Sequence, residues 1–274
     1  MKSFKFTLLT CAFLIILTSC QKDENESTFN EDLIDQETEI ENLLADLDAF
    51  SEEVIDSELG LLKSASLNGT DDEDSCPVIT YYRNSEPRKM IIDFGNECEG
   101  RDGKLRSGKI IITSSSFENL MTTRTKTFEI FSVNGRDIDG IITKTVMLNR
   151  EDKTRISEVH EDLTIASDGK IAFRKGTMNR MQEPGDLYNR SDDRISSWGE
   201  VVTVWQDNLT VTKIILEENP LVFLSACHQI VSGVLFVSAG DKSWSINYGD
   251  GNCDNQAIIT RNGIERQKSL GRSK

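Results

Sequence analysis

Short apolar runs separated by turn dipeptides dominate the chain from residue 76 onward. The runs are rich in Ile, Val, Thr and Phe, and no helical period of useful length interrupts them. The clearest runs are Lys109–Thr113, Lys126–Val133, Gly140–Leu148, Thr154–Ala166, Val201–Trp205 and Thr210–Leu216. The dipeptides that favour tight hairpin turns are Asp102-Gly103, Asn134-Gly135, Asp139-Gly140, Asp168-Gly169, Asp250-Gly251 and Asn262-Gly263. Residues 76–274 are therefore predicted to form an antiparallel meander of about a dozen strands, curled into a barrel-like sheet or folded into a sandwich.

One stretch, Met178–Ser197, departs from this pattern. It contains Pro184-Gly185 and few apolar residues. It is predicted to be a long loop, or two loops around a short strand, and loops of that length are often functional.

Before the strands, the periodicity becomes helical between residues 31 and 63. Ile40, Leu43, Leu47, Phe50 and Val54 follow alternating steps of three and four, with acidic residues predicted on the other faces. The fold class is thus all-β with an N-terminal helix. This acidic amphipathic helix is interpreted either as a coiled-coil stalk or partner-binding helix, or as a helix lying on its own domain or spacing it from a membrane.

The first residues have the pattern of an export signal. Lys2 and Lys5 precede the apolar stretch Phe6–Leu17, which is too short to cross a bilayer. Leu17-Thr18-Ser19-Cys20 resembles the lipobox of bacterial lipoproteins, and this resemblance implies cleavage before Cys20 and acyl chains on its sulfur. The alternative is a membrane-proximal cysteine after an ordinary cleaved signal. The predicted organisation is a signal peptide 1–19, a flexible tether 20–30, the helix 31–63, an acidic linker 64–75 and the β domain 76–274.

Two further resemblances bear on location. Gln21-Lys22-Asp23-Glu24 is similar to the signal that directs Bacteroidota lipoproteins to the outer face of the outer membrane, which implies display on the cell exterior; the periplasmic leaflet is the alternative. Residues 76–274, with the Phe94-Gly95 corner and the segment Tyr248–Asn255, resemble the uncharacterised β-rich lipoproteins of Bacteroidota. That resemblance implies no particular activity.

The charges are distributed unevenly. Residues 23–74 hold nineteen of the 46 acidic residues and a single lysine, whereas residues 75–274 hold 27 charges of each sign. A neutral β domain behind an acidic arm lacks the basic footprint that phosphate binding needs, so nucleic acid is not an expected partner. The clusters Arg83, Arg88 and Lys89, and Arg101, Lys104, Arg106 and Lys109, are predicted to be solvated strand faces rather than anion sites.

Four cysteines remain beyond the signal and the anchor: Cys76, Cys98, Cys227 and Cys253. An even number in an exported chain favours two disulfides, and three pairings are possible. The segments between Cys76 and Cys98 and between Cys227 and Cys253 look like two copies of one strand-turn-strand motif, which favours those two bonds. Free buried thiols are the alternative.

Candidate chemistry is sparse. With His160 and His228 as the only histidines, a nucleophilic triad has little to draw on, and no catalytic residue or cofactor is assigned. Asp250, Asn252 and Asp254 begin like a calcium loop, but Asn255 and Arg261 break the pattern, so an Asx-rich turn is favoured and no metal site is assigned. Trp198, Trp205 and Trp244 are expected to pack in the sheet rather than to stack on sugars.

The expected role is that of a lipid-anchored envelope protein, held in the membrane by acyl chains on Cys20. It is predicted to be a non-enzymatic surface binding or structural module for glycan or protein, with contacts from the Met178–Ser197 loop. The alternatives are a carrier of apolar ligands inside an open curled sheet and, third, a glycosidase-type enzyme with two paired carboxylates. A large apolar cavity would favour the carrier, and paired carboxylates in a cleft would favour the enzyme.

Overall fold

The computed structural model describes residues 31–58, 76–100, 102–185 and 192–270. The predicted signal peptide, Cys20, the tether and the linker 64–75 lie outside these residues. The described part contains one helix, α1 (Glu31–Glu58), and fifteen strands. The strands are β1 Val78–Tyr82, β2 Arg88–Asp93, β3 Cys98–Glu99, β4 Leu105–Ser114, β5 Met121–Val133, β6 Arg136–Leu148, β7 Arg155–Ser167, β8 Lys170–Glu183, β9 Arg194–Trp205, β10 Thr210–Ile215, β11 Leu221–Leu224, β12 Gln229–Ala239, β13 Lys242–Asp250, β14 Gln256–Arg261 and β15 Ile264–Ser269.

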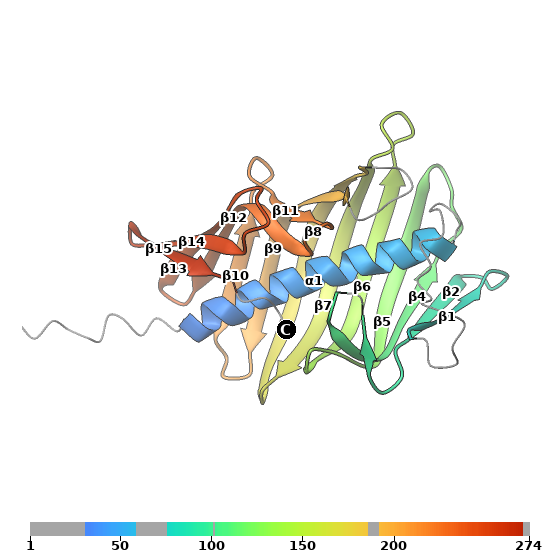
Figure 1. Cartoon of the computed structure of the whole chain (residues 1–274), viewed down its shortest axis with the longest axis horizontal. Helices are drawn as coiled ribbons and strands as arrows, with labels where there is room; N and C mark the ends of the chain where they lie inside the picture. Colours follow the sequence, from blue (N-terminus) through green and yellow to red (C-terminus); the bar gives the residue numbers. More distant parts are fainter. Residues whose placement is uncertain (1–30, 59–75, 101, 186–191, 271–274) are drawn as a thin grey trace, which may run out of the picture.

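All fifteen strands belong to one antiparallel sheet in meander order (Figure 1). The order runs from β1 to β15, except that β3 pairs only with β4, while β11 pairs with both β9 and β12. The edge strands β1 and β15 each have one neighbour. The predicted all-β class with an N-terminal helix is confirmed, and a single open sheet rather than a sandwich is what forms.

The sheet is strongly curved. At the bends, glycines inside strands allow the backbones of neighbouring strands to approach each other closely. A Cβ on Gly108 would lie 2.1 Å from the carbonyl oxygen of Ile130, at a register shift between β4 and β5. A Cβ on Gly140 would lie 2.2 Å from the carbonyl oxygen of Asp162. Such glycines and bulges bend a sheet. The turn predicted at Asp139-Gly140 is therefore wrong, because both residues lie inside β6, whereas Asn134-Gly135, Asp168-Gly169 and Asn262-Gly263 do connect successive strands.

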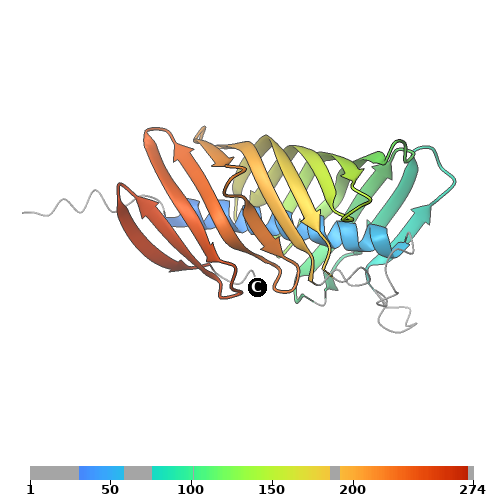
Figure 2. The same ribbon diagram turned by 90° about the horizontal axis from the view of Figure 1, so that it is seen from above.

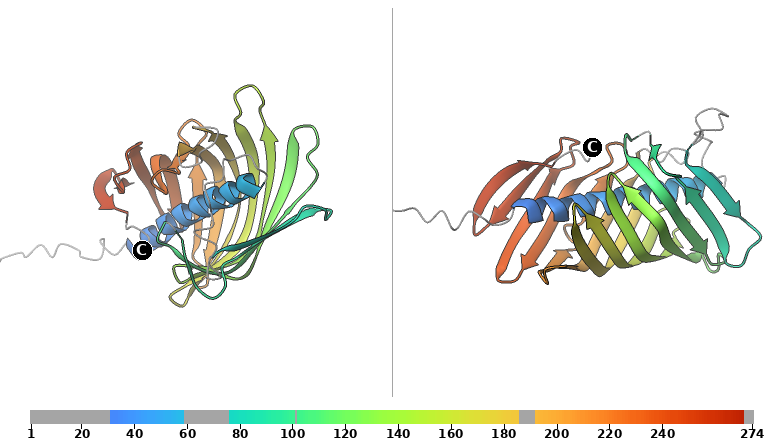
Figure 3. Two further views of the ribbon diagram at one scale, coloured as in Figure 1. Left: turned by 45° about the vertical axis from the view of Figure 1, so that its right-hand side comes forward. Right: turned by 90° about the horizontal axis from the view of Figure 1, so that it is seen from below.

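Helix α1 lies along the concave face of this sheet and crosses most of its strands (Figures 2 and 3). The prediction of a helix over residues 31–63 is confirmed as far as Glu58, and residues 59–63 lie outside the described part. Of the two interpretations, the structure shows the helix packed on its own domain. Its buried apolar residues, such as Leu44, Leu47 and Val54, share one core with Ile110, Val159 and Leu235 of the sheet.

The prediction of a long loop over Met178–Ser197 is wrong for its first six and last four residues, which lie in strands. Residues up to Glu183 continue β8, and Arg194 already begins β9, so the two long strands pair from Ala172–Trp205 to Glu183–Arg194. Arg180 and Gln182 are buried on the concave face although they are polar. The low apolar content that suggested a loop comes from polar side chains that face α1.

Candidate functional site

The concave face of the sheet carries a set of buried or half-buried cations directly under the helix. They share two properties: each faces α1, and each forms an ion pair with a carboxylate. We call this set and its acidic partners the ion-pair layer. The cations are Lys104, Arg106, Arg124, Lys126, Lys144, Arg155, Arg174, Arg180 and Lys213.

The helix supplies most of the carboxylates in this layer. Its 28 residues include twelve acidic residues and neither lysine nor arginine. Glu37, Glu41, Asp46, Asp48, Glu52 and Asp56 are all buried. The prediction that the acids lie on faces away from the packed apolar side is therefore wrong for these six, and each is paired because an ionised carboxylate is buried only with a partner.

At the N-terminal end of α1, Glu37 and Glu41 share Lys213. Its Nζ lies 2.5 Å from Glu37 and 2.7 Å from Glu41, and Trp205 donates its indole N–H to Glu37 at 2.9 Å. Arg174 bridges Glu41 of the helix to Glu161 of β7 at 2.6 and 2.7 Å. Burial alone would raise the pKa of Glu41, but the charges of Arg174 and Lys213 outweigh it and lower that pKa below its ordinary value.

In the middle of the helix, Asp48 and Glu52 lie among several cations. Asp48 contacts Lys144 at 2.9 Å and Arg180 at 2.8 Å. Burial opposes ionisation of Asp48, but these two charges lower its pKa all the same. Lys126 is only 3.8 Å from Asp48, and burial lowers its pKa to about 8 because that distant charge does not offset the desolvation.

A third group surrounds Asp46. Lys104 lies 2.6 Å from it, and His228 Nδ1 lies 3.0 Å away on the opposite side. The hydrogen bond to Asp46 raises the pKa of His228. Lys104 and Arg106 are thus buried, so the prediction that they form a solvated strand face is wrong for them; Lys109 is exposed as predicted.

Beside the C-terminal turn of α1, the described residues leave part of the concave face unfilled. A cavity of about 390 Å³, here called the end cavity, lies against the inner sides of β1, β2, β4, β5, β6 and β7. Its apolar lining residues are Ile55, Tyr81, Met90, Ile112, Phe117, Val146 and Leu148, and its charged ones are Asp56, Arg88, Arg124 and Arg155. Phe117 is 49% exposed, so the cavity reaches the protein surface there.

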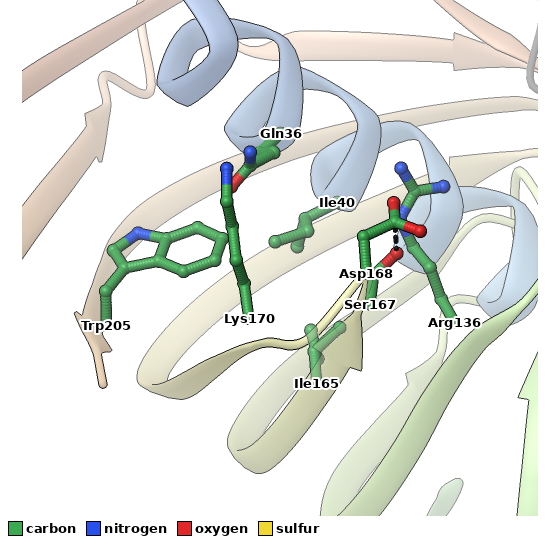
Figure 4. Close-up of a pocket in the computed structure, with 8 residues that line it drawn as sticks. All are labelled: Gln36, Ile40, Arg136, Ile165, Ser167, Asp168, Lys170 and Trp205. Atoms are coloured by element: carbon green, nitrogen blue, oxygen red, sulfur yellow. Dashed lines mark hydrogen bonds between the residues drawn. The ribbon is translucent and has the colours of Figure 1, made fainter. Parts of the chain in front are cut away.

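A second cavity, near the N-terminal half of α1, is much smaller. It measures about 80 Å³ and lies between Gln36 and Ile40 of the helix and Lys170 and Trp205 of the sheet (Figure 4). Its volume is well below the range of small-molecule sites, roughly 300–1,000 Å³. It holds space for a few water molecules and no organic ligand.

The cysteines of the predicted disulfides and the residues of the calcium-like loop are not among the described residues that line the end cavity. Cys76 is bonded to Cys98 and Cys227 to Cys253, as the repeated motif predicted. Asn252 donates its amide to Asp250 at 2.7 Å, and Asp254 accepts the backbone N–H of Gln256 at 3.0 Å. These contacts describe an Asx-rich turn; across the described ranges, no group of three or more His, Cys, Asp or Glu side chains is placed to hold a metal ion.

The remaining candidate side chains have structural surroundings. His160 is exposed on the convex face and contacts Glu158 at 2.8 Å and Thr177 at 3.0 Å. Trp205 and Trp244 are buried, as expected. The sequence did not predict the lining of the end cavity. Arg88, Met90 and Ile92 alternate with outward-facing residues in one apolar stretch, and this alternation could have indicated the inner face of a strand.

Comparisons of the chain with protein-family models, with curated proteins and with solved structures find no match. No helix within the described ranges has both the length and the apolar character needed to span a bilayer.

Proposed function

We propose that this protein is a lipid-anchored envelope protein that binds a small apolar ligand in the end cavity without converting it. The observation that carries the proposal is the cavity itself, whose volume of about 390 Å³ falls in the range of small-molecule sites. The proposal keeps the expectation of a non-enzymatic binding module. Within that expectation, the cavity favours a carrier of apolar ligands over a receptor for glycan or protein.

The lining supports an apolar ligand. Seven of its residues are apolar or aromatic, and Met90, Ile112 and Val146 are almost fully buried on the wall of the cavity. Placing a hydrocarbon against such a wall removes apolar surface from water on both sides, worth roughly 25 cal/mol per Å². The glycan or protein role rested on the Met178–Ser197 loop, half of which forms the ends of β8 and β9, so that support is weakened.

The lining favours binding over hydrolysis. A glycosidase needs two carboxyl groups flanking its substrate. Asp56 is the one carboxylate among the described lining residues, and it accepts two hydrogen bonds from Arg155 at 2.8 and 3.0 Å. A carboxylate held in this way is a poor proton donor or nucleophile.

Membrane attachment through Cys20 rests on the lipobox resemblance alone. In this proposal the acyl chains hold the protein on the outer membrane, preferably facing the exterior, and the sheet presents its end cavity to ligands there. Nucleic acid is no part of the proposal, since the cations of the ion-pair layer are covered by α1.

Binding is tested with N-phenyl-1-naphthylamine, a neutral probe that fluoresces in apolar surroundings. The full chain should bind it saturably with one site per molecule. Val146→Trp, which fills the end cavity, should weaken binding at least tenfold, and Leu148→Trp provides a second filling variant if the first does not fold. Val202→Trp, on the convex face of β9, is the matched control and should bind like the wild type. Absence of saturable binding by the folded wild type would refute the proposal.

Anchoring is tested separately by metabolic labelling. Labelled palmitate should enter the wild-type protein and not Cys20→Ser, which should leave the membrane fraction. Protease treatment of intact cells then distinguishes the exterior from the periplasmic leaflet.

A further inference from the structure

The end cavity is apolar along one wall and positively charged along another. Its described lining includes three arginines, Arg88, Arg124 and Arg155, against one carboxylate, Asp56. The kind of ligand that the cavity can take depends on which of these charges already has a counter-ion in the protein.

Two of the three arginines are already neutralised by the helix. Arg124 lies 2.6 Å from Glu52, and Arg155 binds Asp56 through both of its terminal nitrogens. Both carboxylates belong to the last turns of α1. These pairs form the boundary between the ion-pair layer and the end cavity.

Arg88 differs from them. Its one hydrogen bond among the described residues goes to the backbone carbonyl of Ser115 at 3.2 Å, and within those same residues it forms no ion pair. Arg88 pairs with Ser114, and Ser114 pairs with Arg124, so Arg88 and Arg124 lie in one row on the same face, two strands apart. Neighbouring strands are separated by about 4.8 Å, so the backbones of Arg88 and Arg124 lie about 10 Å apart along this row.

A neutral apolar ligand would cover Arg88 and take water from its charge without replacing it. Burying an arginine without a counter-ion is costly, whereas a ligand with its own anionic group removes that cost. The guanidinium group presents a planar pair of N–H donors that match the two oxygens of a carboxylate.

We infer, building on the proposed function, that the ligand is a single-chain fatty acid anion. Its hydrocarbon chain lies along Met90, Ile112 and Val146, and its carboxylate pairs with Arg88. Arg88 therefore selects among apolar molecules by the charge of their head group.

The test compares decanoate, decanol, decylammonium and decyl phosphate, which share one chain and differ in the head group. Each displaces N-phenyl-1-naphthylamine from the full-length protein in a competition titration below its critical micelle concentration. Decanoate should bind at least tenfold more tightly than decanol, and decylammonium should bind more weakly than decanol. Arg88→Gln should weaken decanoate at least tenfold and leave decanol within twofold. Arg266→Gln, on the opposite edge strand β15, is the control and should change neither.

The outcomes separate the inference from the proposed function. Equal binding of decanol and decanoate, with no effect of Arg88→Gln, would overturn the inference and leave the carrier function standing. Binding of decyl phosphate more than tenfold tighter than decanoate would overturn the assignment of a carboxylate. If no decyl compound and no probe binds, both the inference and the proposed function fall.

Discussion

The concave face has two regions that share strands but differ in what covers them. Under α1, the sheet's buried cations each have a carboxylate partner, and apolar residues of helix and sheet fill the space between them. Beyond the last turn of α1, the same strands line a cavity, and Arg88 is left without an ion pair among the described residues. Strands β5 and β6 run through both regions. The comparison teaches that the helix, and not the sheet, decides which part of the face is filled and which part is left as a cavity.

The largest expected effect comes from breaking a pair under the helix. Arg174→Met leaves Glu41 and Glu161 buried without their common partner, and we expect a loss of about 3–5 kcal/mol in the free energy of unfolding. Lys175→Met is the matched control, because the side chain of Lys175 is 78% exposed and its pair with Asp162 is solvated. That variant should stay within about 0.5 kcal/mol of the wild type in urea unfolding. Equal losses in the two variants would show that the ion-pair layer contributes nothing specific.

Acid should weaken the same layer. The pKa values of Asp46, Asp48 and Glu52 are lowered in the folded protein, because nearby cations outweigh the effect of burial. A carboxylate with a lowered folded pKa stabilises the fold fully above its unfolded pKa, near 4, and loses that contribution as the pH falls further. We expect the unfolding free energy to fall below pH 5 by about 1.4 kcal/mol per pH unit for each proton taken up. An unfolding midpoint in urea that does not change between pH 5 and pH 3 would contradict this.

A pair of enlargements on one strand compares the two regions directly. Ile142 and Val146 both face inward from β6, but Val146 lines the end cavity and Ile142 belongs to the core. Ile142→Phe should cost about 1–3 kcal/mol by overpacking, whereas Val146→Phe should cost less than about 1 kcal/mol because the cavity accepts the ring. Both values come from urea unfolding. The distinction between the regions fails if Val146→Phe is the more destabilising change.

The smallest expected effect concerns Lys126, the least well paired cation of the layer. Burial lowers its pKa to about 8, so its charge is penalised in the folded state at neutral pH. Lys126→Met should therefore raise the unfolding free energy by up to about 1 kcal/mol at pH 7. Lys144→Met should lower it, because Lys144 lies 2.9 Å from Asp48 and 3.2 Å from Glu52. A greater loss for Lys126→Met than for Lys144→Met would reverse this interpretation.

The ion-pair layer explains which sequence predictions succeeded and which failed. Strands with apolar inner faces, such as Lys109–Thr113, were predicted correctly, and so were the helix and both disulfides. The end of β8, Met178–Glu183, was mistaken for a loop because its inner positions Arg180 and Gln182 are polar. The acids of α1 were expected on the faces away from its apolar residues, and six of them are buried against the sheet. Hydrophobic periodicity finds a buried face only when that face is apolar, and here ion pairs replace much of it.

The end cavity could not be predicted in this way. Its existence depends on where α1 ends relative to β2, β4 and β6, and this is a tertiary relation between segments that begin 30 or more residues after the helix ends. The excess of acids in residues 23–74 over a balanced β domain was the one visible signal that the two parts pair.

The pairing of an N-terminal helix with strands much later in the chain also constrains the order of folding. Lys213 is 176 positions from Glu37, and Arg174 is 133 positions from Glu41. Alone, a helix with twelve acids and no basic residue is weakened by repulsion between like charges one turn apart. Its partners come together as a surface only where β4 to β10 are paired, so we expect the helix to dock after the sheet has formed. Such long-range closure is slow, and until it is complete the newly made sheet exposes a row of arginines and lysines along its inner side.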